Sequence, residues 1–272
     1  FPTRRSSDLN MERYNMERYN MEEIIHAKNI IKSFHEGSEN QRILDGISLS
    51  VREGEFISVM GPSGSGKSTL LFALSGMDRI DSGSVSFCGS DLSACTENQL
   101  ADLRRTQMGF VFQQPTLLKN LNILDNIILP SLRDKKKDVS RITEKARSLM
   151  KETGIGELED RDISHASGGQ LQRAGICRAL MNDPRILFGD EPTGALNSKS
   201  AQEIMDIFTE INAQGTAVML VTHDARIAAR TERVLFLCDG RIVREAHFPI
   251  YTGKDMEQRM EKIMELMKEA GI

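Results

Sequence analysis

The sequence predicts an α/β fold built on a mainly parallel β-sheet. Three runs of consecutive apolar residues indicate strands that are buried on both faces, at residues 186–188, 218–221 and 234–237. Between the first two runs, Ile204, Phe208 and Ile211 recur at helical spacing. Ser198 is placed to be the N-cap of that helix. Strands that alternate with helices are typical of parallel sheets.

The most specific motif is a glycine-rich loop at residues 61–68, Gly-Pro-Ser-Gly-Ser-Gly-Lys-Ser. It fits G-x-x-x-x-G-K-[ST], the P-loop that cradles nucleotide phosphates with backbone N–H groups. Lys67 would supply a cation to the β- and γ-phosphates, and the Ser68 hydroxyl would bind Mg²⁺. The residues that we expect to contact ATP here are Gly61, Pro62, Ser63, Gly64, Ser65, Gly66, Lys67, Ser68 and Thr69.

The flanking sequence distinguishes this loop from a chance glycine-rich turn. Residues 56–60 form an apolar, strand-like run directly before it. Residues 68–75 are typical of a helix, and Gly76 is placed to end that helix. Strand, glycine loop and helix are the setting that the motif requires.

Polar residues follow three further strand-like runs. Gln113 follows residues 109–112, the pair Asp190 and Glu191 follows residues 186–189, and His223 follows Thr222. Ligands of open α/β sheets bind outside the carboxyl ends of the strands, so we expect these residues to converge on the P-loop.

Each of these polar residues has a chemical role if that convergence holds. Asp190 would be the second magnesium-binding residue, and Glu191 would polarise the water that attacks the γ-phosphate. His223 is a candidate γ-phosphate sensor. Taken alone, the acidic pair would be a solvated strand end and His223 a structural histidine, but their order after a P-loop favours the functional interpretation.

Composition excludes some functions. The chain has 272 residues, enough for one large domain or two small ones, and 27% of them are charged. Its net charge of −4 argues against a nucleic-acid partner. No apolar run approaches the roughly 20 residues that span a bilayer, so a membrane role would depend on a partner. The four cysteines are widely spaced and form no metal-binding pair.

The two ends of the chain differ from its middle. Residues 1–20 begin with Phe1 and repeat Met-Glu-Arg-Tyr-Asn in tandem, and we interpret them as a non-native or disordered leader before a start near Met21. Helical spacing predicts a helical insertion over about residues 96–165. Residues 246–272 form an extension whose methionines make one apolar helical stripe, which would either pack on the domain or dock a partner.

Residues 166–170, Ala-Ser-Gly-Gly-Gln, resemble the signature motif of ATP-binding-cassette (ABC) ATPases, and the resemblance covers about residues 24–245. It implies an ABC cassette at residues 21–245, with an N-terminal antiparallel β subdomain beside the parallel core. By resemblance, Gln113 is a catalytic residue and a magnesium ligand, and His223 is the switch histidine. Phe34 resembles the aromatic that stacks on adenine, although a core position is an alternative. The signature residues implied to contact ATP are Ser167, Gly168, Gly169 and Gln170.

Two residues depart from the family pattern. Ala166 replaces the usual leucine of the signature, at a packing position, and Asn197 replaces an aspartate that helps to couple two sites across a dimer. The departure at Asn197 leaves the coupling between sites in doubt. Residues 109–113 and 190–194 resemble the branch of macrolide exporters, lipoprotein-release ATPases and peptide-antibiotic exporters.

This branch implies an ATPase that acts with partners. The expected partners are a second ATPase chain, in a homodimer that completes each ATP site, and a separately encoded membrane permease. We expect the chain to lie at the cytoplasmic face of the membrane, held there by the permease. Two alternatives stay open at this point: a cell-division-type ATPase that regulates a membrane partner without transport, and a soluble iron–sulfur assembly ATPase.

Overall fold

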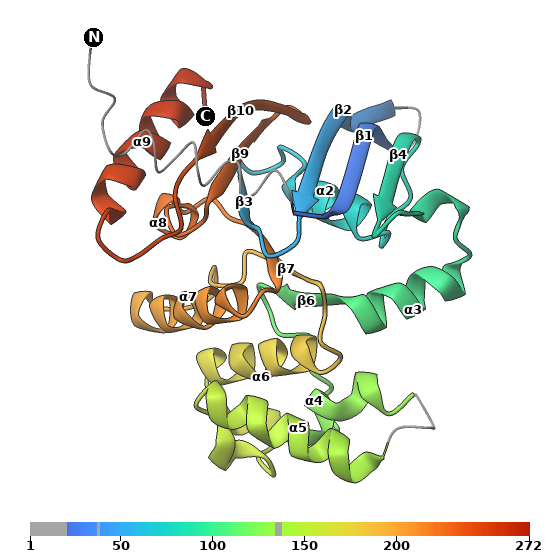
Figure 1. Ribbon diagram of the computed structural model, residues 1–272, viewed down its shortest axis with the longest axis vertical. Helices are drawn as coiled ribbons and strands as arrows, with labels where there is room; N and C mark the ends of the chain where they lie inside the picture. Colours follow the sequence, from blue (N-terminus) through green and yellow to red (C-terminus); the bar gives the residue numbers. More distant parts are fainter. Residues whose placement is uncertain (1–20, 37–38, 134–137) are drawn as a thin grey trace.

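A six-stranded sheet with the order β10-β9-β3-β8-β7-β6 forms the centre of the protein (Figure 1). The computed structural model describes residues 21–36, 39–133 and 138–272; the leader predicted at residues 1–20 lies outside them. Every neighbouring pair in this sheet is parallel except β10 and β9, which confirms the predicted mainly parallel core. The strands are β3 (Phe56–Met60), β6 (Met108–Phe112), β7 (Ile186–Asp190), β8 (Ala217–Val221), β9 (Arg233–Cys238) and β10 (Arg241–His247).

A second sheet, with the order β2-β1-β4-β5, is antiparallel, as the family resemblance implied for the N-terminal part. Its strands are β1 (Glu23–Glu36), β2 (Glu39–Arg52), β4 (Ser82–Phe87) and β5 (Ser90–Asp91). Side chains of both sheets share one apolar cluster with α2 (Lys67–Leu74), which includes Ile25 and Val85 from the second sheet and Val59 from β3. The P-loop helix is therefore held between the two sheets.

Three helices form a separate layer, seen at the bottom of Figure 1. They are α4 (Ile123–Ile128), α5 (Val139–Glu152) and α6 (Gly168–Leu180), and they share a buried apolar cluster that runs from Ile123 to Met181. Helix α3 (Glu97–Gln107) packs elsewhere, because its Leu100 belongs to the cluster of the two sheets. The insertion predicted at residues 96–165 thus contributes to two packing layers. Short 3₁₀ turns complete the chain: η1 (Leu92–Ala94), η2 (Leu129–Ser131), η3 (Gly156–Leu158) and η4 (Ile163–His165).

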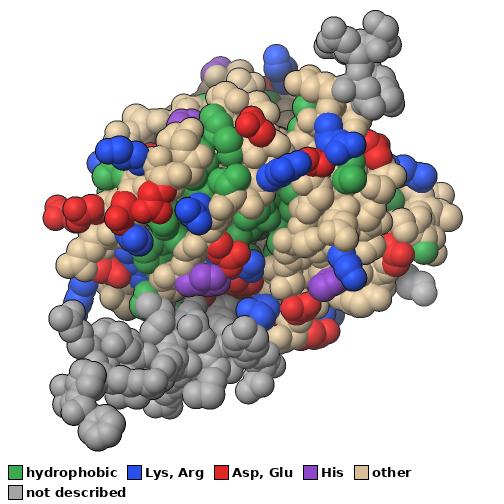
Figure 2. All heavy atoms as spheres, turned by 90° about the horizontal axis from the view of Figure 1, so that it is seen from above, with side chains coloured by type: hydrophobic (Ala, Val, Ile, Leu, Met, Phe, Trp, Pro, Cys, Tyr) green, Lys and Arg blue, Asp and Glu red, His purple; other side chains and the backbone are tan. Residues whose placement is uncertain are grey.

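Helices α7 (Ser198–Ala213) and α8 (Ala225–Ala228) connect the later strands of the large sheet. Asn197, rather than Ser198, is the N-cap of α7, because its side chain accepts a hydrogen bond from the backbone N–H of Ser200. On the face shown in Figure 2, acidic and basic side chains are interspersed around a central apolar area. Within the described residues, the helices are too short or too polar to cross a membrane.

The C-terminal helix α9 (Met256–Glu269) packs on the large sheet beside α8. Ile263 is fully buried in a cluster with Phe236 of β9, and Met256 and Met260 pack against the same cluster. Met264 points away and is 53% exposed. Most of the apolar stripe predicted for the extension is therefore used for packing on the domain.

We expect Ile263→Ala to lower the free energy of unfolding by about 2–4 kcal/mol, because it removes a fully buried branched side chain and leaves a cavity. Met264→Ala, on the exposed side of the same helix, should change it by less than about 0.5 kcal/mol. Chemical denaturation of both variants measures the difference. Equal effects would show that α9 does not pack on the domain through Ile263.

Candidate nucleotide-binding and catalytic site

The P-loop lies between the buried strand β3 and helix α2, and its glycines are required by close backbone approaches. Gly66 has φ 100° at the N-cap of α2, and a Cβ there would lie 2.8 Å from the carbonyl oxygen of Ile43. A Cβ on Gly61 would lie 2.0 Å from the carbonyl oxygen of Leu237. Larger residues would therefore displace the backbone at both positions.

The N-terminus of α2 is directed at the position expected for the phosphates. The first N–H groups of a helix have no partner within the helix, and its dipole favours an anion there. The loop and this helix end together make an anion site of the P-loop kind.

Lys67 extends across the loop and is 7% exposed. Its Nζ donates to the carbonyl oxygens of Gly61 at 2.9 Å and of Pro62 at 2.8 Å. Burial lowers the pKa of Lys67, and the nearby carboxylates of Glu191 and Asp190 oppose that shift. The ammonium group is thus partly desolvated, which strengthens its attraction to a phosphate oxygen.

Ser68 and Asp190 lie together at the start of α2, where they could hold a divalent cation. The Ser68 Oγ donates to the Asp190 Oδ1 at 2.8 Å. Burial raises the pKa of Asp190, while the bond from Ser68 and the charge of Lys67 lower it. A hydroxyl and a carboxylate oxygen are ligands that Mg²⁺ accepts, with nucleotide phosphates and water completing its shell. The donor set therefore fits Mg²⁺.

Glu191 has a strained backbone and faces the site. Its φ of 45° lies in the left-handed region, which non-glycine residues seldom adopt. Its backbone N–H donates to the carbonyl oxygen of Val221 at 3.0 Å, which ties it to β8. Its Oε1 lies 3.1 Å from the His223 Nδ1. The side chain of His223 is 68% exposed and that of Glu191 26%, so water can reach both.

Gln113 reaches the same place from β6. The position that a Cβ on Gly194 would occupy is 3.0 Å from the Gln113 Nε2 and 3.3 Å from the Glu191 Oε2. The side chains of Gln113 and Glu191 therefore lie side by side, with Gly194 leaving room for both. The structure thus brings together the P-loop, Gln113, Asp190, Glu191 and His223.

The signature residues lie on the helical layer. Ser167 is the N-cap of α6, and it forms a capping box in which its Oγ accepts from the Gln170 N–H and the Gln170 side chain accepts from the Ser167 N–H. A Cβ on Gly169 would lie 3.3 Å from the Ser200 Oγ of α7. In Figure 1, α6 and α2 lie on opposite sides of β6 and β7.

Phe34 is not a core residue. It is 46% exposed on β1, and the Lys32 Nζ lies 4.9 Å from the centroid of its ring. The alternative of a core position is therefore wrong, and the ring is available to stack on a planar group.

Two polar residues of α6 that sequence reasoning missed hold the segment around Gln113. The Gln172 Nε2 donates to the carbonyl oxygen of Phe112 at 2.9 Å, and Gln172 is 1% exposed. The Arg178 Nη1 donates to the carbonyl oxygen of Thr116 at 2.7 Å. Their sequence gives no sign of these partners, which are about sixty residues away.

A P-loop with an acidic pair at the end of a parallel strand in the same sheet defines an NTPase of the P-loop class. The family model described as ABC transporter matches residues 44–194. The chain belongs to the ABC transporter family. Bacitracin export ATP-binding protein BceA of Halalkalibacterium halodurans is 40% identical to it, over 92% of this chain and 96% of that protein.

Two further relatives agree with this assignment. Lipoprotein-releasing system ATP-binding protein LolD of Aquifex aeolicus is 44% identical, over 82% of this chain and 97% of that protein. The dimeric ATP-binding cassette MJ0796, solved in a post-hydrolysis state bound to ADP and Pi, superimposes with a TM-score of 0.78 at 35% identity. That match covers 84% of this chain and all of that one.

We expect Lys67→Ala to weaken ATP binding by about 30- to 1,000-fold, because a desolvated charge contact to phosphate is worth about 2–4 kcal/mol. Titration with a fluorescent ATP analogue measures the dissociation constant. Lys151→Ala, on the exposed side of α5, is the control and should bind like the wild type. Unchanged affinity of the Lys67 variant would contradict the P-loop assignment.

We expect Glu191→Gln to slow hydrolysis by about 10²–10⁴-fold with little change in ATP affinity, because an amide cannot accept a proton from the attacking water. His223→Ala should also slow turnover. The two effects should be non-additive, since the side chains are in contact. Single-turnover kinetics of both variants and the double variant measure this. If Glu191→Gln keeps more than about a tenth of the wild-type rate, Glu191 is not the general base.

Proposed function

We propose that this chain is the ATP-binding and ATP-hydrolysing subunit of an ABC exporter and that it drives a separate membrane permease. The observation that carries the proposal is the contact between Glu191 and His223 beside a complete P-loop. The names of BceA and LolD, an export and a release ATPase subunit, support the direction of transport. The ATPase domain would span residues 21–245, with its helical subdomain at about 96–165 and an extension at 246–272.

The residues divide into three roles in this proposal. Lys67 and the P-loop backbone bind the phosphates, and Phe34 stacks on the adenine. Ser68, Asp190 and Gln113 hold Mg²⁺, which would neutralise charge on the phosphates. The remaining two act on the reaction itself: Glu191 removes a proton from the attacking water, and His223 orients the γ-phosphate.

We propose that two copies of the chain form each complete site. The capping box of Ser167 leaves the first N–H groups of α6 as an anion site of its own, on a different layer from the P-loop. A second chain that faces the first would place its signature over the γ-phosphate. The dimeric arrangement of MJ0796 supports this proposal.

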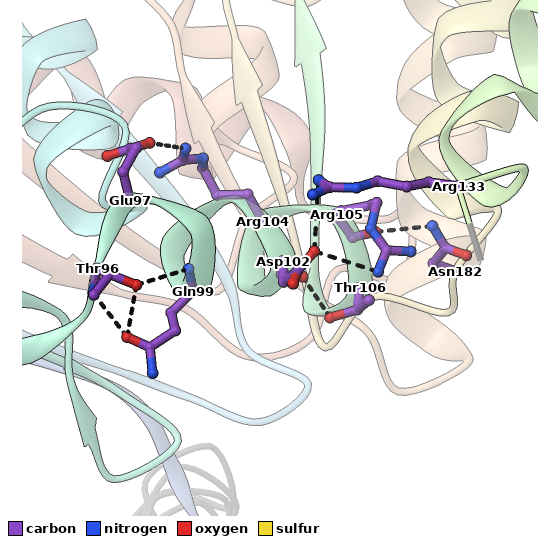
Figure 3. Close-up of polar contacts among 9 residues, drawn as sticks. All are labelled: Thr96, Glu97, Gln99, Asp102, Arg104, Arg105, Thr106, Arg133 and Asn182. Carbon is purple, nitrogen blue, oxygen red and sulfur yellow. Dashed lines mark hydrogen bonds and ion pairs between the residues drawn. The ribbon is translucent and has the colours of Figure 1, made fainter. Parts of the chain in front are cut away.

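A groove between α3 and α6 is the place where we expect the permease to contact the chain. It has a volume of about 250 Å³, and Phe110, Pro130 and Met77 form part of its lining. Arg105 also lines it; its Nη2 lies 3.5 Å from the Asp102 carboxylate, while its Nε and Nη1 have no partner within the described residues (Figure 3).

The loop between Gln113 and α4 continues this surface. Leu118 is 47% exposed, and the fully buried Asn126 fixes its backbone by donating to its carbonyl oxygen at 3.1 Å and accepting from its N–H at 2.7 Å. We propose that this exposed leucine, with its backbone fixed by Asn126, is a contact for the permease. We therefore propose that the chain is a peripheral protein, held at the cytoplasmic face of the membrane by the permease.

We expect Glu191→Gln to dimerise in saturating Mg-ATP, because ATP held without hydrolysis keeps both composite sites closed. Light scattering with and without ATP measures the mass. Lys67→Ala, which should not retain ATP, is the matched control and should stay monomeric. A Glu191→Gln chain that binds ATP and stays monomeric, alone and with its permease, would contradict the composite site.

We expect a photo-crosslinker at Leu118 or Asn120 to capture the permease in membranes. The same probe at Met264, which is 53% exposed on α9, should not. Immunoblotting for the adduct measures both. Capture at Met264 alone would place the contact on the C-terminal helix and contradict the proposal that the permease contacts the loop between Gln113 and α4.

A further inference from the structure

Arg259 of α9 is a buried cation that joins the C-terminal helix to the turn after α8. It is 3% exposed. Its Nε donates to the Asp255 Oδ2 at 2.6 Å, and its Nη2 donates to the carbonyl oxygen of Pro249 at 2.6 Å. Its Nη1 lies 3.3 Å from the carbonyl oxygens of both Ala229 and Thr231. A buried charge is tolerated when its donors are satisfied in this way.

The turn that Arg259 holds is anchored on the strand that leads into the P-loop. Ala229 is the C-cap of α8. The Thr231 side chain is fully buried, and its Oγ1 lies 2.9 Å from the Ser58 Oγ of β3. The next residue, Glu232, donates its backbone N–H to the carbonyl oxygen of Phe56 at 2.9 Å. The guanidinium therefore fixes the end of α8 relative to β3.

The other end of α8 begins immediately after His223. Asp224 is its N-cap and accepts from the Arg226 N–H at 2.8 Å. A helix of this length has no stability of its own, so its position depends on the packing of the buried Ile227 and Ala228 and on the elements that hold its ends. The side chain of His223 is 68% exposed and has little packing to fix it. The backbone of His223 is held on one side by the end of β8, where the Thr222 N–H donates to the carbonyl oxygen of Val59 at 3.1 Å, and on the other side by α8 and the turn that follows it.

We propose that Arg259 is a positioning residue for His223. Through this residue, the C-terminal helix α9 contributes to the geometry of the ATPase site. The proposal rests on the proposed function, because it assumes that His223 acts in hydrolysis. A shift of about 1 Å in a catalytic group can cost up to 10²-fold in rate. Lysine cannot replace Arg259, because its single ammonium group cannot reach all the acceptors that the three nitrogens of the planar guanidinium reach.

The test is a double-mutant cycle in the full-length chain. Arg259→Lys should lower kcat by roughly 5- to 20-fold and leave the KM for ATP within about 2-fold. In the His223→Ala background the same substitution should cause no further loss, because the residue through which it acts is gone. Lys262→Ala is the control, because Lys262 is on the same helix and its side chain is 52% exposed. The kcat of this variant should equal that of the wild type.

Two results would overturn the positioning role: an unchanged kcat in folded Arg259→Lys, or the same fold-loss with and without His223. If Arg259→Lys does not fold, Asp255→Asn replaces it in the same cycle with the same two criteria, because it keeps the guanidinium and weakens its anchor. The proposed function would instead be contradicted if the wild-type chain had no ATPase activity. It would also be contradicted if the Glu191→Gln variant kept the activity of the wild type. Activity that needs Glu191 but not Arg259 contradicts the positioning role alone.

Discussion

The parallel register of four strands is the constraint on which the site depends. Phe112 pairs with Asp190, Asp190 with Val221, and Val59 with Val221, so these residues form one row across β6, β7, β8 and β3. The residues that follow this row are therefore brought to one edge of the sheet. A slip of one residue in any strand would turn its side chains to the opposite face. The buried strands resist such a slip because both of their faces are packed against helices.

The charges at this edge balance one another only in part before a nucleotide binds. Lys67, Asp190 and Glu191 are close enough for the two carboxylates to raise the pKa of the lysine while burial lowers it. The desolvation that raises the pKa of Asp190 also makes a divalent cation favourable beside it. The polyphosphate and its metal would thus arrive as complementary charges in a site of reduced dielectric, where each contact is stronger than in water.

Local patterns in the sequence were sufficient for strands β3, β7, β8 and β9 and for the place of the P-loop directly after β3. The apolar runs at 186–188, 218–221 and 234–237 are strands β7, β8 and β9, because a buried strand needs apolar residues on both faces. The packing of α3 was not predicted. Its spacing is helical, but nothing in residues 97–107 shows that Leu100 packs with the two sheets rather than with α4 and α5. Helical periodicity indicates which face of a helix is buried, but it does not indicate which element packs against that face.

Contacts between distant side chains and backbone carbonyl groups could not be predicted from the sequence either. They show how the candidate catalytic residues Gln113 and His223, which are exposed, can be held in place. Gln172 and Arg178 bind the backbone on either side of Gln113. Arg259 does the same for the segment that follows His223. In both cases a helix outside the sheet donates side-chain hydrogen bonds to backbone carbonyl groups of a connecting segment, and Gln172 and Arg259 are buried. Since a buried donor without an acceptor costs about 1–3 kcal/mol, separating Phe112 from Gln172, or Thr231 from Arg259, carries that cost. Gln172 and Arg178 thus tie the backbone beside Gln113 to α6, the helix whose first turn includes Gly168, Gly169 and Gln170.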